Sequence, residues 1–308
     1  MISSLALVGA YAIDLAFGEP KNAFHPVAWI GRAIAVGRDW ALVPGPLGQL
    51  LRGGLVALSI PITAATLAFG ALSAIGHRPV FTVLATALLL KPMFAVRGLR
   101  DAAFAVRDAL DRGDIGAARR GLGSLCSREA DGLDASALIA ATVESVAENA
   151  SDSIVAPLLF FGCLGLPGAV FYRSVNTLDA MMGYRGRFEY AGKIAARLDD
   201  ALNLVPARLT AGLLLIAGLF VGADASAGLR VLRRDGGRTE SPNAGRPMAA
   251  MAGLLGVCLE KPGHYALGDP RDDLGTCHIT RAWTIARLAS VLALLLTVLL
   301  LGVASWMH

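Results

Sequence analysis

The feature that most constrains this chain is a series of long stretches without charged residues. Residues 53–76 contain no Asp, Glu, Lys or Arg, and neither do residues 288–306. A helix that crosses a bilayer needs about 20 mostly apolar residues, because the hydrocarbon core is about 30 Å thick. Only 17% of all residues are charged, against about 25% in soluble domains. The sequence therefore predicts a polytopic membrane protein.

We predict an all-α polytopic membrane fold with about five transmembrane helices, a re-entrant helix pair and cytoplasmic amphipathic helices. Residues 154–172 are also uncharged, but Gly165, Pro167 and Gly168 interrupt them. Broken helices at membrane depth are tolerated where they line a polar cavity, so we expect two helices that turn at this point. A single crossing stays open as the alternative. The predicted spans are Ile2–Phe17, Gly53–Gly76, Pro79–Val96, Leu209–Ala223 and Leu288–Trp306.

The distribution of basic residues predicts the orientation in the membrane. Residues 97–134 contain seven arginines, and cytoplasmic loops are rich in Arg and Lys, so this side is placed in the cytoplasm. Lys91, near the end of one predicted span, would extend its amine toward the interface. The net charge of +4 then follows from topology. No nucleic-acid partner is expected, because no basic stretch is interleaved with aromatic residues.

We expect one integral membrane domain over residues 1–308. Residues 1–96 would form N-terminal helices and a hairpin, and residues 97–208 a polar catalytic region with the re-entrant pair. Residues 209–308 would form C-terminal helices with a basic loop at 226–287. The apolar spacing of residues 187–204 predicts a further amphipathic helix, ended by Pro206.

The densest polar cluster comes directly before the interrupted apolar run. Glu144 and Glu148 are four residues apart, so they share one face of a helix and repel each other. At the edge of a membrane this repulsion favours a bound cation or substrate amine between them. Asn149 and Asp152 continue the polar face. We predict a catalytic site here, with a solvated acidic face as the alternative.

Two further clusters follow. Tyr172, Arg173, Asn176 and Asp179 form a polar strip at helical spacing, and such strips at a membrane border indicate a site; interfacial anchoring is the alternative.

The third cluster contains Asp199, Asp200 and Asn203, whose hard oxygen atoms suit Mg²⁺. This ion is commonly held by one or two carboxylates together with phosphate oxygens. Helix capping and ion pairing with Arg197 and Arg208 is the alternative reading.

The remaining candidates are loop residues. Asn243 lies in a Pro-Asn turn, and the nearby Gly236, Gly237 and Arg238 could hold a phosphate through backbone N–H groups and a guanidinium. Lys261 follows in a second polar segment. His25 precedes a proline and is a weaker candidate, because a lone histidine is usually structural.

These clusters are compatible with two classes of function. An intramembrane prenyl or alcohol-phosphate transferase would use Asp152 and the Asp199-Asp200 pair to hold a Mg-pyrophosphate. A transporter or membrane sensor would use broken helices with acidic ends, although no inverted repeat is visible. Neither a P-loop nor a dinucleotide-binding glycine motif is present.

Taken in order, these segments resemble the cobinamide-phosphate synthase family of cobalamin biosynthesis, the CobD/CbiB proteins. The resemblance covers nearly the whole chain and is carried by several spaced motifs. These are Asp14, Gly18-Glu19-Pro20 and His25-Pro26-Val27; Glu144 to Asp152; Tyr172 to Tyr184; Arg197 to Arg208; and Pro242-Asn243-Ala244-Gly245 with Tyr265 to Gly268.

The resemblance implies a multi-pass enzyme of the bacterial inner membrane, with its active site facing the cytoplasm. It would join adenosylcobyric acid to aminopropanol O-phosphate, or to aminopropanol, through an amide, and the family is described as using ATP. A complex with other corrinoid-pathway enzymes is open.

Within this chemistry we assign Mg²⁺ to Asp199, Asp200 and Asn203, and the substrate ammonium to Glu144 or Glu148. Asn149, Asp152 and Asp179 complete the catalytic group. Substrate and phosphate binding is assigned to His25, Tyr172, Arg173, Asn176, Arg208, Asn243 and Lys261.

Overall fold

The computed structural model describes residues 1–308 except 21, 77, 185, 271, 307 and 308. The chain forms two compact units, each drawn from separated stretches of sequence. The first contains Met1–Ala95, Ala156–Asn203 and Leu294–His308, and the second contains Val96–Val155 and Leu204–Ala293. The expectation of a single domain over the whole chain stays a prediction.

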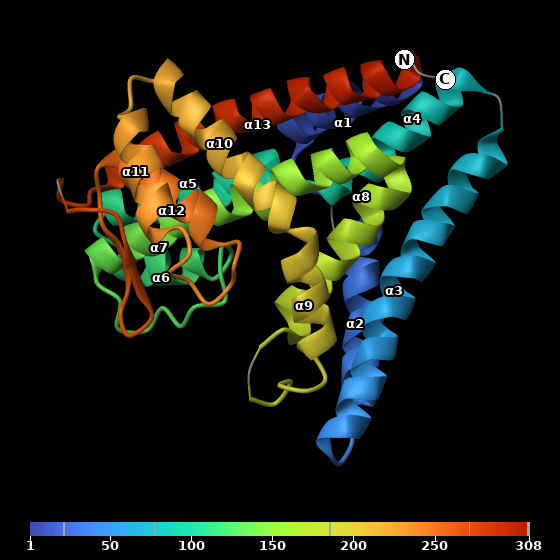
Figure 1. Ribbon diagram of the computed structural model, residues 1–308, viewed down its shortest axis with the longest axis horizontal. Helices are drawn as coiled ribbons and strands as arrows, with labels where there is room; N and C mark the ends of the chain where they lie inside the picture. Colours follow the sequence, from blue (N-terminus) through green and yellow to red (C-terminus); the bar gives the residue numbers. More distant parts are fainter. Residues whose placement is uncertain (21, 77, 185, 271, 307–308) are drawn as a thin grey trace. The chain divides into compact units, whose positions relative to one another are not determined.

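In the first unit, apolar helices pack side by side. Helix α3 contacts both α2 and α8, and α1 contacts α4; Figure 1 shows α2 and α3 running alongside each other. Helices α2, α3 and α4 each begin with a proline, whose missing N–H would have no partner at that position. The elements are α1 (Ile2–Phe17), η1 (Asn22–Phe24), α2 (Pro26–Ala41), α3 (Pro46–Ile75), α4 (Pro79–Leu90), η2 (Lys91–Met93), α8 (Ala156–Met182) and α9 (Lys193–Leu202).

In the second unit, three aspartates begin helices. Asp114, Asp134 and Asp224 each accept a hydrogen bond from a backbone N–H of the first turn, at the start of α6, α7 and α11. The elements are α5 (Val96–Asp111), α6 (Ile115–Leu122), α7 (Ala135–Ala150), the π-helical turn η3 (Ser151–Val155), α10 (Leu204–Phe220), α11 (Ala225–Asp235), α12 (Gly245–Leu255), β1 (Leu259–Lys261), β2 (Tyr265–Leu267) and α13 (Thr276–Trp306), which ends in the first unit.

Long apolar helices confirm the predicted class of all-α polytopic membrane protein. Within the described residues, four helical segments are long and apolar enough to cross a membrane, and α9 with α10 would make a fifth. Helix α1 is apolar but shorter. The four segments are Pro46–Ile75, Pro79–Asp111, Ala135–Met182 and Thr276–Trp306.

Helix α8 is a pair of helices that fold back on each other. Gly165 adopts φ 65° and ψ −161° inside it, a conformation essentially restricted to glycine. Phe160 and Tyr172 would be about 18 Å apart along a straight helix, yet their rings stack with centroids 4.9 Å apart. The predicted turn in this segment is therefore present.

Two local predictions are wrong. Residues 226–287 are not a basic loop, because α11, α12 and the β1–β2 hairpin occupy much of this segment. Val231 is buried on one face of α11, and nearly every residue of the small-residue helix α12 is buried.

The amphipathic helix expected over 187–204 is restricted to α9, preceded by a turn. Pro206 does not end it but lies in the first turn of α10, where proline is tolerated.

Candidate functional site

Many of the predicted residues lie in two groups, one of which also contains Arg128 and Tyr265. The Asp199 cluster, in the first unit, consists of Tyr172, Arg173, Asn176, Asp179, Asp199, Asp200 and Asn203. The Glu144 cluster, in the second unit, consists of Arg128, Glu144, Glu148, Lys261 and Tyr265.

Helices α8 and α9 bring the Asp199 cluster together. Gly192, just before α9, lies so close to the Met182 carbonyl at the end of α8 that a Cβ would be 1.6 Å from the oxygen. Only glycine permits this approach, which places Asp199 of α9 beside Asn176 of α8. The two helices are in direct contact.

Two side-chain amides orient Asp199. Asn203 donates to Asp199 Oδ2 at 2.9 Å, and Asn176 donates to Oδ1 at 3.4 Å. Each carboxylate oxygen therefore has one neutral donor, and its other lone pair remains for a ligand.

The amides are themselves fixed by their oxygen atoms. The Tyr172 hydroxyl donates to Asn203 Oδ1 at 2.8 Å, and Arg173 donates to Asn176 Oδ1 at 3.2 Å. Tyr172 is fully buried and Asn203 nearly so. Tyr172, Arg173 and Asn176 thus act on Asp199 in this structure, whereas the sequence suggested that they bind substrate directly.

Asp179 and Asp200 add negative charge around Asp199. Both interact repulsively with it. Within the described part of the chain, neither Asp179 nor Asp199 forms an ion pair, and Arg197 lies 4.0 Å from Asp200. No group of three or more His, Cys, Asp or Glu side chains among those residues is arranged to hold a metal alone.

In the Glu144 cluster, one buried carboxylate oxygen carries all the contacts. Glu144 Oε2 accepts from Arg128 Nη2 at 2.5 Å and from the Tyr265 hydroxyl at 3.2 Å. Arg128 also donates to the Tyr265 oxygen at 3.3 Å. The other oxygen, Oε1, is buried without a hydrogen-bond partner, in a side chain that is 4% exposed.

The β1–β2 hairpin brings two polar side chains to this carboxylate. Lys261 and Tyr265 are directly paired across the two strands, so their side chains lie on the same face of the hairpin. Strand β1 contacts α7, and Lys261 and Glu148 act electrostatically on Glu144 and Tyr265 respectively. Burial and the Glu144 carboxylate raise the pKa of Tyr265, so it remains a donor at neutral pH.

The other two predicted residues of this segment have different surroundings. Asn149 donates to the Ser145 carbonyl at 2.9 Å and accepts from Ser153 at 3.0 Å, so its amide is engaged within the protein. Asp152 lies in the π-helical turn η3. Such turns are rare in proteins, and those that occur are often at functional sites.

Two of the predicted phosphate-binding residues, Arg208 and Asn243, contact each other. Arg208 Nη1 lies 3.4 Å from Asn243 Oδ1 and donates to the Leu204 carbonyl. The structure does not favour the phosphate site suggested around Arg238, because protein groups already occupy its guanidinium. Arg238 lies 3.0 Å from Asp235 and donates to the Ala266 carbonyl.

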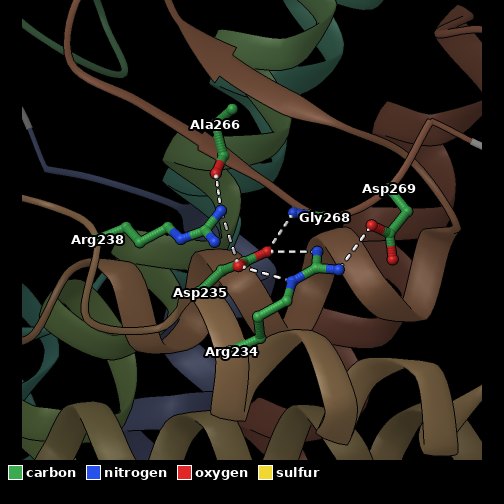
Figure 2. A network of polar contacts seen from close by, with 6 residues as sticks. All are labelled: Arg234, Asp235, Arg238, Ala266, Gly268 and Asp269. Carbon is green, nitrogen blue, oxygen red and sulfur yellow. Dashed lines mark hydrogen bonds and ion pairs between the residues drawn. The ribbon is translucent and has the colours of Figure 1, made fainter.

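Figure 2 shows the network that surrounds the fully buried Asp235. Arg234 donates to both of its carboxylate oxygens and to Asp269, and the Gly268 N–H donates at 2.9 Å. Burial alone would raise the pKa of Asp235, but the Arg234 and Gly268 hydrogen bonds lower it. This network fastens the end of strand β2 to α11.

His25 belongs to a separate ionic cluster in the first unit. Its Nε2 lies 2.7 Å from Glu19 Oε2. Lys91 Nζ lies 3.1 Å from the same oxygen and 3.3 Å from the fully buried Asp14. The expectation that the Lys91 amine reaches the interface is wrong, since its side chain is 5% exposed and paired with buried acids.

Sequence reasoning missed the partners of the catalytic candidates. Arg128 was one arginine among seven in its segment, and Tyr265 was part of a motif without a role. Both contact Glu144 from distant positions in the chain. Only the presence of a carboxylate in an apolar helix signalled that such partners were needed.

The helices and the two clusters define a class: a multi-pass, all-α membrane protein with buried carboxylates held by directed polar contacts. The profile of the family described as CobD/Cbib protein matches residues 7–305. The chain belongs to the CobD/CbiB family.

Named relatives are similar over most of their length. Cobalamin biosynthesis protein CobD of Dehalococcoides mccartyi is 45% identical over 87% of this chain and 86% of its own. The proteins of the same name from Geobacter metallireducens and Rhodobacter capsulatus are 40% and 42% identical, over 85% and 84% of this chain and 85% and 82% of their own. No solved structure matches the chain.

Proposed function

We propose that this protein is an enzyme of cobalamin biosynthesis, an adenosylcobinamide-phosphate synthase. It joins a propionate carboxylate of adenosylcobyric acid to the amine of aminopropanol O-phosphate, or of aminopropanol, through an amide. The observation that carries this proposal is the family match over residues 7–305. The two clusters of buried polar residues support an enzyme over a purely structural membrane protein.

Amide formation from a free carboxylate requires activation, which we assign to ATP. The carboxylate oxygen would attack the γ-phosphorus and release ADP. The amine would then attack the acyl carbon of the acyl phosphate, inorganic phosphate would leave, and the ammonium proton would pass to a base. These reaction steps need a site for polyphosphate and a separate site for an amine.

The Asp199 cluster suits the polyphosphate. Mg²⁺ would neutralise phosphate charge there. Asp199 would bind the ion together with Asp200 or Asp179. Asn203 would bind it only if its amide oxygen also accepts the Tyr172 hydrogen bond. Asp199 and Asp179 form no ion pair among the described residues, so their charge is available to a cation. The ion would complete its ligand shell with phosphate and water oxygens, as Mg²⁺ commonly does. In the second unit, Arg208 and Lys261 are proposed to bind a phosphate group of the substrate, separately from the Asp199 cluster.

The Glu144 cluster suits the amine. Glu144 Oε1 is a buried acceptor without a donor, and a substrate ammonium would provide one. Glu148, one helical turn away, adds a second carboxylate that can receive the proton.

The test uses the full-length protein in detergent with adenosylcobyric acid, aminopropanol phosphate, Mg²⁺ and ATP. Mass spectrometry of the corrinoid should detect the amide product only when ATP is present. Glu148→Gln should abolish it, while Glu240→Gln, at an exposed acid, should not. An unchanged corrinoid with folded protein would overturn the proposal, and unchanged corrinoid accumulating inside sealed proteoliposomes would favour a transporter.

We further propose that the protein lies in the bacterial inner membrane with the active site toward the cytoplasm. The seven arginines of residues 97–134 support this orientation. ATP and the corrinoid do not cross a bilayer unaided, so inverted vesicles should form product and sealed right-side-out vesicles should not. The reverse result would invert the proposed topology.

A further inference from the structure

We propose that the β1–β2 hairpin is a positioning element of the active site. Through Tyr265, and together with Arg128, it holds Glu144 by one oxygen and leaves the other to receive a primary ammonium. This inference rests on the proposed function for its substrate. It assigns Tyr265 and Arg128 as positioning residues, which act through Glu144.

The two oxygens of Glu144 differ sharply. Oε2 has a guanidinium donor at 2.5 Å and a phenol donor at 3.2 Å, whereas Oε1 has none. A buried acceptor without a donor costs free energy, and a carboxylate that served only to pair with Arg128 could use both oxygens in a bidentate contact. The one-sided arrangement keeps Oε1 for a donor that arrives with the substrate.

The hairpin fits a ligand that carries both signs of charge. Lys261 stands beside Tyr265 on the same face of the hairpin and acts electrostatically on Glu144. An ammonium at Glu144 Oε1 would thus lie near a cation able to attract an anionic group of the same molecule.

The Asp235 network ties strand β2 of the hairpin to helix α11 (Figure 2). Asp235 accepts from the Gly268 N–H at 2.9 Å, and Arg238 donates to the Ala266 carbonyl at 3.4 Å. These contacts immediately follow Tyr265 in the chain. The Asp235 network therefore limits the movement of the Tyr265 hydroxyl relative to Glu144.

The test compares Tyr265→Phe with Tyr190→Phe, which removes a hydroxyl from an exposed tyrosine. Steady-state rates are measured while the amine substrate and the corrinoid are varied separately. Loss of one hydrogen bond to a charged group should raise the KM for the amine about tenfold. The KM for the corrinoid should stay unchanged. Titration calorimetry with aminopropanol phosphate, without ATP, should show the same tenfold weakening.

A fall in kcat alone, or equal changes in both KM values, would indicate a general structural effect and overturn the inference. So would amine binding by Tyr265→Phe equal to that of the wild type. If the wild-type protein forms no amide, the proposed function fails instead, and calorimetry then shows whether the amine still binds through Tyr265.

Discussion

The two clusters hold their carboxylates in opposite ways. Asp199 is oriented by two neutral amides, whereas one oxygen of Glu144 accepts a hydrogen bond from a guanidinium. Neutral donors fix the direction of a carboxylate without cancelling its charge. An arginine partner on one oxygen cancels much of the carboxylate charge, but a directed lone pair remains on the other oxygen. The Asp199 carboxylate is therefore suited to a divalent ion, and the Glu144 carboxylate to a single ammonium.

Asp199→Asn is expected to have the largest effect. The substitution keeps the shape but removes the charge proposed to hold Mg²⁺. Product formation should fall about 100-fold or more, because changes one step further from a metal already cost 10- to 100-fold. Asp101→Asn, at an exposed surface acid, is the matched control. Activity within a few-fold of wild type would remove Asp199 from the catalytic site.

Tyr172→Phe tests whether the neutral amides matter. The ring can still stack on Phe160, but Asn203 loses the donor that fixes its amide. Mn²⁺ affinity, measured by electron paramagnetic resonance in the presence of ATP, should fall about 10-fold. Leu166→Met, a buried change of similar volume on the same helix pair, should leave it unaltered. Equal affinities for both variants would show that Asn203 is held without Tyr172.

Asp235→Asn tests the ionic network around Asp235 in the second unit. The variant keeps the size of the side chain but loses its charge-assisted hydrogen bonds, so we expect a loss of about 1–3 kcal/mol in stability. Because the folded-state pKa of Asp235 is lowered, the wild type has this stabilisation above the unfolded pKa of about 4. It loses it as the pH falls through the folded pKa.

Thermal melts of both proteins in detergent, from pH 7 down to pH 3, provide the measurement. The difference in Tm between wild type and variant should shrink on acidification. A difference that stays constant with pH would mean that the Asp235 charge contributes nothing.

Gly165→Ala tests the turn at which the two halves of α8 fold back on each other in the first unit. Alanine is strained at φ 65° and ψ −161°, so we expect destabilisation of about 1–3 kcal/mol. Gly212→Ala, in a helix with open space around the added methyl group, should be neutral or slightly stabilising. Similar Tm values for the two variants would show that the turn does not depend on glycine.

The sequence contained the information for local features and lacked it for distant contacts. The uncharged runs and the Gly165–Gly168 interruption predicted the helices and their fold-back, because both depend on neighbouring residues. The residues of the Asp199 cluster were also found, since helical spacing brings Asp199 and Asn203 to one face. The Arg128–Glu144–Tyr265 contact joins residues up to 137 positions apart, and no periodicity reports such pairing. The charge of Arg238 suggested phosphate binding, because the sequence does not show that its guanidinium donates to the Ala266 carbonyl, 28 positions away.

The buried Lys91–Asp14 pair also has a consequence for biogenesis. Helix α1 is only 16 residues long and carries Asp14 at a fully buried position. An unpaired carboxylate or ammonium is costly in a bilayer, and the two charges lie 3.3 Å apart across α1 and the end of α4. During synthesis α1 emerges from the ribosome well before Lys91. We therefore expect the stable insertion of α1 to depend on α4, which leads to its partner Lys91.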